Sequence, residues 1–182
     1  MLFKTLSRSL SVLKLDQNIY KEIKNDNSSI YQSIFIITIA GLINVFLFKI
    51  HIAPTLTTTV PLHYIFLVWI FFNWYLFSII LNFVANQNND KTTIKEKKIA
   101  LTLVGFSNSA EILKILIIFA PNFIILISWG ALMLVLASQV IGVKQIYKIE
   151  KISTSIGIVV LSYIIQIFSI IALFIFAFKL AN

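Results

Sequence analysis

The chain has 182 residues, of which 59% are hydrophobic and 12% are charged, and its net charge is +8. Soluble domains are only about 45–50% apolar, so this composition indicates a single membrane domain. The lack of cysteine excludes disulfides, thiolate nucleophiles and cysteine-ligated metals. The basic residues lie in short blocks beside apolar segments, which favours membrane orientation and argues against nucleic acid as a partner.

The N-terminal segment, residues 1–29, is the most polar part of the chain. Its first turns place apolar residues at helical spacing: Leu2, Phe3, Leu6, Leu10 and Leu13. We expect an amphipathic helix lying on the cytoplasmic leaflet, where apolar burial and attraction to anionic lipid act together. The basic side chains expected to contact the lipid surface are Lys4, Arg8 and Lys14. A solvated tail is the alternative, and Asp16 is expected to cap a second short helix.

Residues 30–182 contain five apolar segments, each close to the roughly 20 residues that a helix needs to cross a bilayer. These segments cover residues 30–50, 61–85, 99–120, 122–143 and 156–178. The connections between them are short, so sequential helices should be antiparallel neighbours. The sequence therefore predicts an all-α polytopic membrane protein, with five transmembrane helices in one bundle and an interfacial helix before them.

The distribution of Lys and Arg predicts the orientation of this bundle. Twelve of the 15 basic residues precede the first span or lie between spans two and three and between spans four and five. Cytoplasmic loops carry the excess of Lys and Arg, so these three regions should share the cytoplasmic side. This arrangement requires the third segment to cross completely, and it puts the N-terminus inside and the C-terminus outside.

The third segment carries polar residues near the middle of the bilayer: Ser107, Asn108, Ser109, Glu111 and Lys114. An isolated charge at that depth costs about 2.5–3.5 kcal/mol on insertion scales, so such residues need partners. On a helix, Glu111 and Lys114 share a face and can neutralise each other. The favoured interpretation is a local ion pair turned toward the bundle. The alternative is an intramembrane site, with non-helical backbone lining a polar cavity.

Enzymatic chemistry finds little support in the sequence. Phosphate-binding glycine loops, zinc-protease motifs and paired acidic residues on facing spans are not found, and the two histidines have no neighbouring carboxylates. With Glu111 as the only acid inside a span, a general acid and base couple is not expected. We therefore expect a non-enzymatic protein without a metal or other cofactor.

The order of these elements resembles the Yip domain family of integral membrane proteins. The likeness runs over residues 15–178 and depends on a polar N-terminal helix, five spans, and the run Gly105-Phe106-Ser107 in the third span. It also includes Pro121 between spans three and four, and Trp129 followed by the run 141–144, Ile-Gly-Val-Lys. The chain departs from the family where members often have tyrosine in place of Phe106 and a proline shortly after it.

The resemblance implies a five-span bundle with a cytoplasmic N-terminus, and a role in membrane organisation or trafficking. It does not extend to a GTPase partner, because the Asp-Leu-x-Gly-Pro-like motif of the cytosolic region in eukaryotic members is missing here. Similarity to the short prokaryotic members implies the cytoplasmic membrane of a bacterium or archaeon.

Two hypotheses follow from the sequence. The favoured one is a membrane-organising scaffold that acts through helix and lipid contacts, with the bilayer, a second copy or another membrane protein as partner. The other is a small transporter or channel component that uses the polar middle of span three. The second hypothesis requires a water-accessible cavity that reaches Glu111. A dry bundle in which that carboxylate bonds only Lys114 would remove its support.

Overall fold

The computed structural model describes residues 2–51, 62–87 and 94–181, and within these ranges the chain is helical with no strand. Two short helices come first, α1 (Leu2–Leu13) and α2 (Gln17–Asn25). The long helices that follow are α3 (Ser29–His51), α4 (Leu62–Asn86), α5 (Ile94–Ser107), α7 (Ile124–Ile146) and α8 (Ile152–Ala181). A 3₁₀ stretch, η1 (Asn108–Ile115), and the short α6 (Leu116–Phe119) and η2 (Pro121–Phe123) connect α5 to α7.

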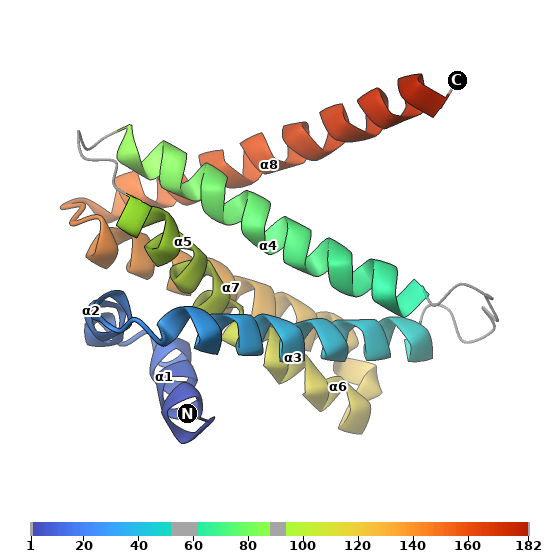
Figure 1. Ribbon diagram of the computed structural model, residues 1–182. Helices are drawn as coiled ribbons and strands as arrows, with labels where there is room; N and C mark the ends of the chain where they lie inside the picture. The colour runs from blue at the N-terminus through green and yellow to red at the C-terminus, as the bar shows by residue number, and fades with distance from the viewer. Residues whose placement is uncertain (1, 52–61, 88–93, 182) are drawn as a thin grey trace.

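The prediction of an all-α bundle with five spans is confirmed. Five regions are long and apolar enough to cross a membrane: Ser29–Ile50, Ile65–Asn86, Lys97–Phe119, Pro121–Ile146 and Ile152–Phe176. The third of these consists of α5, η1 and α6 in succession, which run from one end of the bundle to the other (Figure 1). The chain is therefore an integral membrane protein. Two residues used in the predictions lie outside the described residues: Pro61, where the second predicted span begins, and Lys91, which was counted among the cytoplasmic basic residues.

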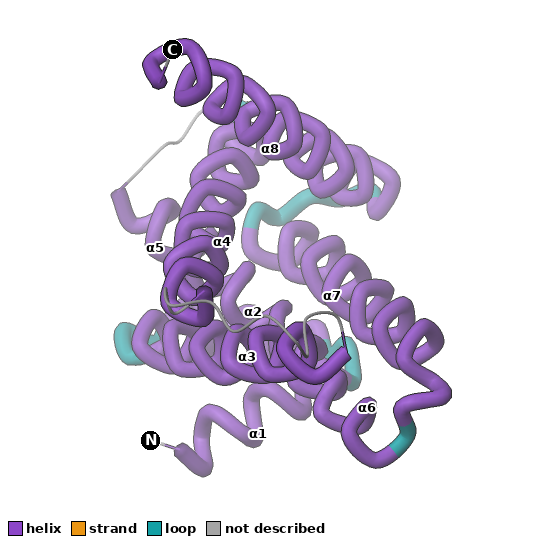
Figure 2. The backbone as a smooth tube through the Cα atoms, turned by 90° about the vertical axis from the view of Figure 1, so that its right-hand side faces the viewer, coloured by secondary structure: helices purple, strands orange, loops and turns teal. Residues whose placement is uncertain are grey.

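One end of the bundle, which we call the basic end, carries α1 and α2, the starts of α5 and α8, and the end of α7 (Figure 1). The described basic residues at the beginning or end of these last three helices are Lys97, Lys98, Lys144, Lys148 and Lys151. The C-terminal end of α8 lies at the opposite end from α1. Figure 2 looks along the bundle and shows α1 passing beneath α3.

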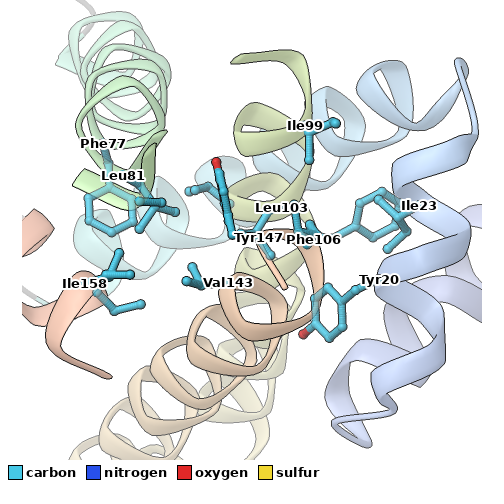
Figure 3. Packing of buried hydrophobic residues seen from close by; sticks show 14 of the residues in the cluster. Tyr20, Ile23, Phe77, Leu81, Ile99, Leu103, Phe106, Val143, Tyr147 and Ile158 are labelled. Carbon is cyan, nitrogen blue, oxygen red and sulfur yellow. The ribbon is translucent and has the colours of Figure 1, made fainter. Parts of the chain in front are cut away.

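The hydrophobic core fills the basic half of the bundle. Figure 3 shows Tyr20 and Ile23 of α2 packing on Leu103 and Phe106 of α5, with Val143 of α7 beside them. Tyr20 and Phe106 are each 0% exposed, and burial raises the pKa of the Tyr20 phenol. Helix α2 is thus an integral part of the core. Its predicted N-cap is confirmed, since the Asn18 backbone N–H donates to Asp16 Oδ1 at 2.9 Å.

Helix α1 packs with its polar side against the protein and its apolar side outward. Thr5, Arg8 and Ser9 are buried, whereas the apolar side chains are exposed: Leu2 61%, Phe3 89%, Leu6 54% and Leu10 57%. An aqueous environment would disfavour this orientation, but the interfacial region of a bilayer favours it. Figure 1 shows α1 running across the direction of α3, as a helix lying along a membrane surface would.

Arg8 differs from the expectation that it faces lipid headgroups. Its side chain is 3% exposed and pairs with Glu22 at 2.6 Å and with Asp26 at 2.8 Å. Its Nη1 also donates to Gln32 Oε1 at 3.0 Å. The acidic side chains lie on and just after α2, a long-range arrangement that helical spacing does not reveal. Lys4 and Lys14 remain exposed, and Lys4 pairs with Asp26 at 2.8 Å.

Candidate functional site

The polar run in the third span breaks the regular α-helix. Ser107 Oγ donates to Leu103 O at 3.0 Å, Asn108 Nδ2 to Val104 O at 2.7 Å, and Ser109 Oγ to Phe106 O at 2.6 Å. Side chains that bond the backbone three or four residues earlier compete with the helical hydrogen bonds. A 3₁₀ stretch of eight residues follows, Asn108–Ile115, whereas such runs rarely exceed four residues. Segment 99–120 therefore crosses as a helix whose middle is tightened.

The 3₁₀ stretch carries the predicted ion pair. Lys114 Nζ lies 2.5 Å from Glu111 Oε2, and the two side chains are only 19% and 15% exposed. Asn44 of α3 completes the group, because its Nδ2 donates to Glu111 Oε2 at 3.0 Å and its Oδ1 accepts from Lys114 Nζ at 3.2 Å. The charges thus cancel inside the bundle, and one amide from a neighbouring span bonds both of them.

A cavity of about 290 Å³ lies beside this group and reaches Glu111. Every span contributes to its wall, and the polar side chains that line it are Asn44, Asn73, Asn108, Glu111, Gln139, Tyr163 and Gln166. At roughly 30 Å³ per water molecule, this volume corresponds to on the order of ten waters. A cavity thus reaches Glu111, whose carboxylate bonds Asn44 as well as Lys114, and its access to water stays a prediction of the transporter hypothesis.

The amide of Gln139 is the most informative group in this wall. Its side chain is 1% exposed, and its Oε1 has no hydrogen-bond partner in the part of the chain that the structure describes. Opposite amides are weakly bonded, since Gln166 Nε2 donates to Asn73 O and Oδ1 at 3.3 Å each. A buried acceptor without a partner costs about 1–3 kcal/mol. This oxygen is shielded in the structure, so a molecule in the cavity would donate to it only after the Gln139 side chain turns.

Trp69 of α4 separates this cavity from an apolar groove on the lipid side. The groove has a volume of about 560 Å³ and is lined by Ile65, Val68, Trp69, Phe72, Ile170, Leu173 and Phe174. It follows the divergence of α8 from α4 (Figure 1). The Trp69 ring packs on Phe72 at 5.7 Å and on Phe174 at 6.0 Å between centroids. The Trp69 side chain thus lines both the polar cavity and the apolar groove.

The structure brings together part of the predicted site. Asn108 and Glu111 line the cavity and Lys114 holds Glu111, whereas Ser107 and Ser109 are buried and bond their own helix. Five polar side chains of the cavity wall were not predicted from the sequence: Asn44, Asn73, Gln139, Tyr163 and Gln166. The four spans other than the third each carry an amide inside the apolar run, but the sequence does not show that these amides meet: Asn44, Asn73, Gln139 and Gln166.

Comparison with known proteins does not show which family the chain belongs to. No family model, curated protein or solved structure matches the chain. The likeness to the Yip domain family therefore stays a prediction, and the chemistry of the site has to come from its own geometry.

The side chains that line the cavity form hydrogen bonds and carry little net charge. Glu111 is the one acid in the cavity wall, and Lys114 neutralises it. Within residues 2–51, 62–87 and 94–181, no group of three His, Asp or Glu side chains lies close enough to hold a metal ion. The remaining polar groups are amides and a phenol, which donate and accept hydrogen bonds at fixed positions.

Proposed function

We propose that the protein is non-enzymatic and binds a small polar solute in the central cavity, as a component of a transport path through the membrane. The observation that carries this proposal is the convergence of seven Asn, Gln, Glu and Tyr side chains, from all five spans, on one space. Polar groups in the bilayer cost free energy unless they are bonded. A bundle held by packing alone has no need to gather them.

The bonding groups point to a neutral solute. The Glu111 and Lys114 charges cancel, so the cavity wall has no net charge to attract an ion. Gln139 Oε1 needs a donor, and the neighbouring amides provide both donors and acceptors. Small molecules with hydroxyl or amide N–H groups meet these requirements.

Solute flux in proteoliposomes tests the proposal. Stopped-flow light scattering after an osmotic step with glycerol or urea compares wild-type vesicles, Gln139→Leu vesicles and empty vesicles. Wild type should be faster than empty vesicles for at least one solute, and Gln139→Leu should lose that gain. Its free energy of unfolding should change by less than about 1 kcal/mol, because removal of the unbonded oxygen offsets the loss of the hydrogen bond between Gln139 and Tyr163. Equal rates for wild type and Gln139→Leu contradict the proposal.

Gln87→Leu is the matched control for that experiment. It removes the same amide from an exposed position at the end of α4, outside the cavity. The control should keep the wild-type flux. A loss of flux in Gln87→Leu would mean that the assay responds to any glutamine on the protein and not to the cavity.

A second candidate function is membrane organisation of the Yip type. The observation that favours it is α1, which holds its polar face on the bundle and presents Leu2, Phe3, Leu6 and Leu10 outward. An apolar helix face inserted into one leaflet adds area to that leaflet and favours curvature. The outer half of α8 also exposes large apolar side chains, including Phe168, Phe174 and Phe178, which suit contact with lipid or a second copy.

The size of reconstituted vesicles tests this candidate. Wild-type protein should produce smaller vesicles than a Leu6→Asn, Leu10→Asn variant at the same protein density, because the variant inserts less apolar surface. The variant should fold normally, since both side chains are exposed. Vesicles of equal size would count against a membrane-shaping role. Light scattering of the purified protein would report whether it is a monomer or an oligomer.

A further inference from the structure

Helices α2 and α7 form a second pocket at the basic end, separate from the central cavity. Its volume is about 560 Å³, and its lining consists of Lys21, Lys24, Asn25, Lys144, Gln145, Lys148 and Ile149. Four of these seven residues are lysines and none is acidic. Two of the lysines come from α2, one from the last turn of α7 and one from the turn after it, so the cluster exists only in the folded protein.

Contacts within the protein account for the position of only two of these four lysines. Lys24 Nζ donates to Ile146 O at 3.0 Å, and Lys144 lies in the last turn of α7, where a cation complements the helix dipole. Lys21 and Lys148 have no ion pair within the described residues, and both are exposed. Of the nearby acids, Glu22 pairs with Arg8, and Glu150 is not part of the lining. No acidic side chain in the lining of the pocket therefore balances the positive charge of its lysines.

The backbone conformation at Lys148 is a second, independent indication that the lysines of this pocket bind something. Lys148 has φ of 53°, in the left-handed region, and it follows α7 in a turn in which the Ile149 N–H donates to Lys144 O at 3.0 Å. Glycine usually occupies such a position, since a side chain there costs about 1 kcal/mol. The chain instead places a lysine at this turn, on the rim of the pocket.

The position of the pocket decides what can enter it. It flanks the last turn of the membrane-crossing helix α7, at the same end of the bundle as α1 with its outward apolar face (Figure 1). Lipid headgroups lie at this depth, and basic pockets at the ends of spans bind anionic headgroups. We propose that the pocket binds the phosphodiester headgroup of an anionic phospholipid, with Lys21, Lys144 and Lys148 as the ligating cations.

Native mass spectrometry of the full chain tests this site. The protein is released from nanodiscs that contain phosphatidylglycerol and phosphatidylcholine, and the lipids it retains are counted. Wild type should retain phosphatidylglycerol. Lys144→Gln with Lys148→Gly should bind it roughly thirtyfold more weakly, because each lysine near the surface contributes a factor of about five. Glycine relaxes the turn at residue 148 and offsets the loss of the Lys144 charge at the end of α7, so this variant should fold about as well as wild type.

Two controls keep the result unambiguous. Lys97→Gln with Lys151→Gln removes the same charge from exposed positions at the same end, and should retain the lipid. Lys144→Arg should also retain it, because arginine keeps the charge. Adding inorganic phosphate should not displace the lipid. Equal lipid loss in the two charge-removing double variants, or displacement by inorganic phosphate, would overturn the proposal, the latter in favour of a soluble anion.

Discussion

Arg8 connects the N-terminal segment to the bundle. Its guanidinium bonds Glu22, Asp26 and Gln32, which belong to α2, the turn after it, and α3. The guanidinium is shielded from water although Glu22 is partly exposed, so losing Arg8 would leave Asp26 and Gln32 without a partner that the fold has placed for them. This contact explains why the polar face of α1 turns inward and its apolar face outward.

Arg8→Gln should therefore lower the free energy of unfolding by about 2–3 kcal/mol. Lys14→Gln removes the same charge from an exposed side chain and should change it by less than about 0.5 kcal/mol. Chemical unfolding in mixed micelles measures both values. Similar effects of the two substitutions would show that Arg8 acts only through its charge.

Asp26 makes the stability of this junction depend on pH. Hydrogen bonds from Lys4 and from the Ser28 backbone N–H hold the pKa of Asp26 well below its usual range. A lowered folded-state pKa contributes stability above the unfolded-state pKa of about 4, and this contribution is lost as the pH falls further. Asp26→Asn should be less stable than wild type at pH 7, and the difference between the two thermal midpoints should begin to narrow below about pH 4 and keep narrowing as the pH falls toward the lowered pKa of Asp26. A constant difference down to pH 3 would contradict this linkage.

The ion pair in the third span can be tested by a double-mutant cycle. Lys114→Met leaves the Glu111 carboxylate in the bundle with Asn44 as its remaining partner, and should destabilise by about 2–3 kcal/mol. Adding Glu111→Gln should recover about half of that loss or more, because no charge then remains buried. The unfolding free energies of the four proteins give the coupling. Additive losses would mean that the two side chains act independently.

At the scale of the helices, the contact between α3 and α5 depends on Gly105. A Cβ at this position would meet the Ser33 side chain and approach its Cα to 3.1 Å. The backbone of α3 cannot move aside as a flexible side chain would. The close approach brings the start of the 3₁₀ stretch beside α3, from which Asn44 reaches Glu111.

Gly105→Ala should lower the free energy of unfolding by about 1–3 kcal/mol through overpacking. Gly130→Ala is the matched control, because nothing lies within 4 Å of an added Cβ there. Alanine should be neutral or stabilise α7 by up to about 1 kcal/mol at that position. Thermal unfolding in detergent compares the two, and an equal effect would argue against close packing at Gly105.

The helices themselves could be predicted from sequence because their lengths and apolar character are local properties. The ranges 30–50 and 122–143 differ from α3 and from α7 by three residues or fewer at each end. The Glu111 and Lys114 pair was also predictable, since residues three apart share a helix face. The burial of Arg8 was not, because its acidic partners Glu22 and Asp26 lie on other elements far along the chain.

At the scale of the whole molecule, the cavity could not be predicted for the same reason. Asn44, Asn73, Gln139 and Gln166 each look ordinary within their own spans, and only the packing of five helices brings them together. Sequence spacing gives the face of a helix but not which faces meet. Transport of a polar solute requires this cavity to be open to water in the membrane.

Cysteine accessibility at two adjacent positions of α8 tests that claim directly. The chain has no native cysteine, so Gln166→Cys and Ile167→Cys each carry a single thiol. Residue 166 lines the cavity, whereas Ile167 is 56% exposed on the outer surface at the same depth. Thiols react as thiolates, which form in water and not in lipid. In proteoliposomes, a small charged methanethiosulfonate should modify the Gln166→Cys protein faster than the Ile167→Cys protein, by a factor of about ten or more. Equal, slow modification of both would contradict a water-filled cavity.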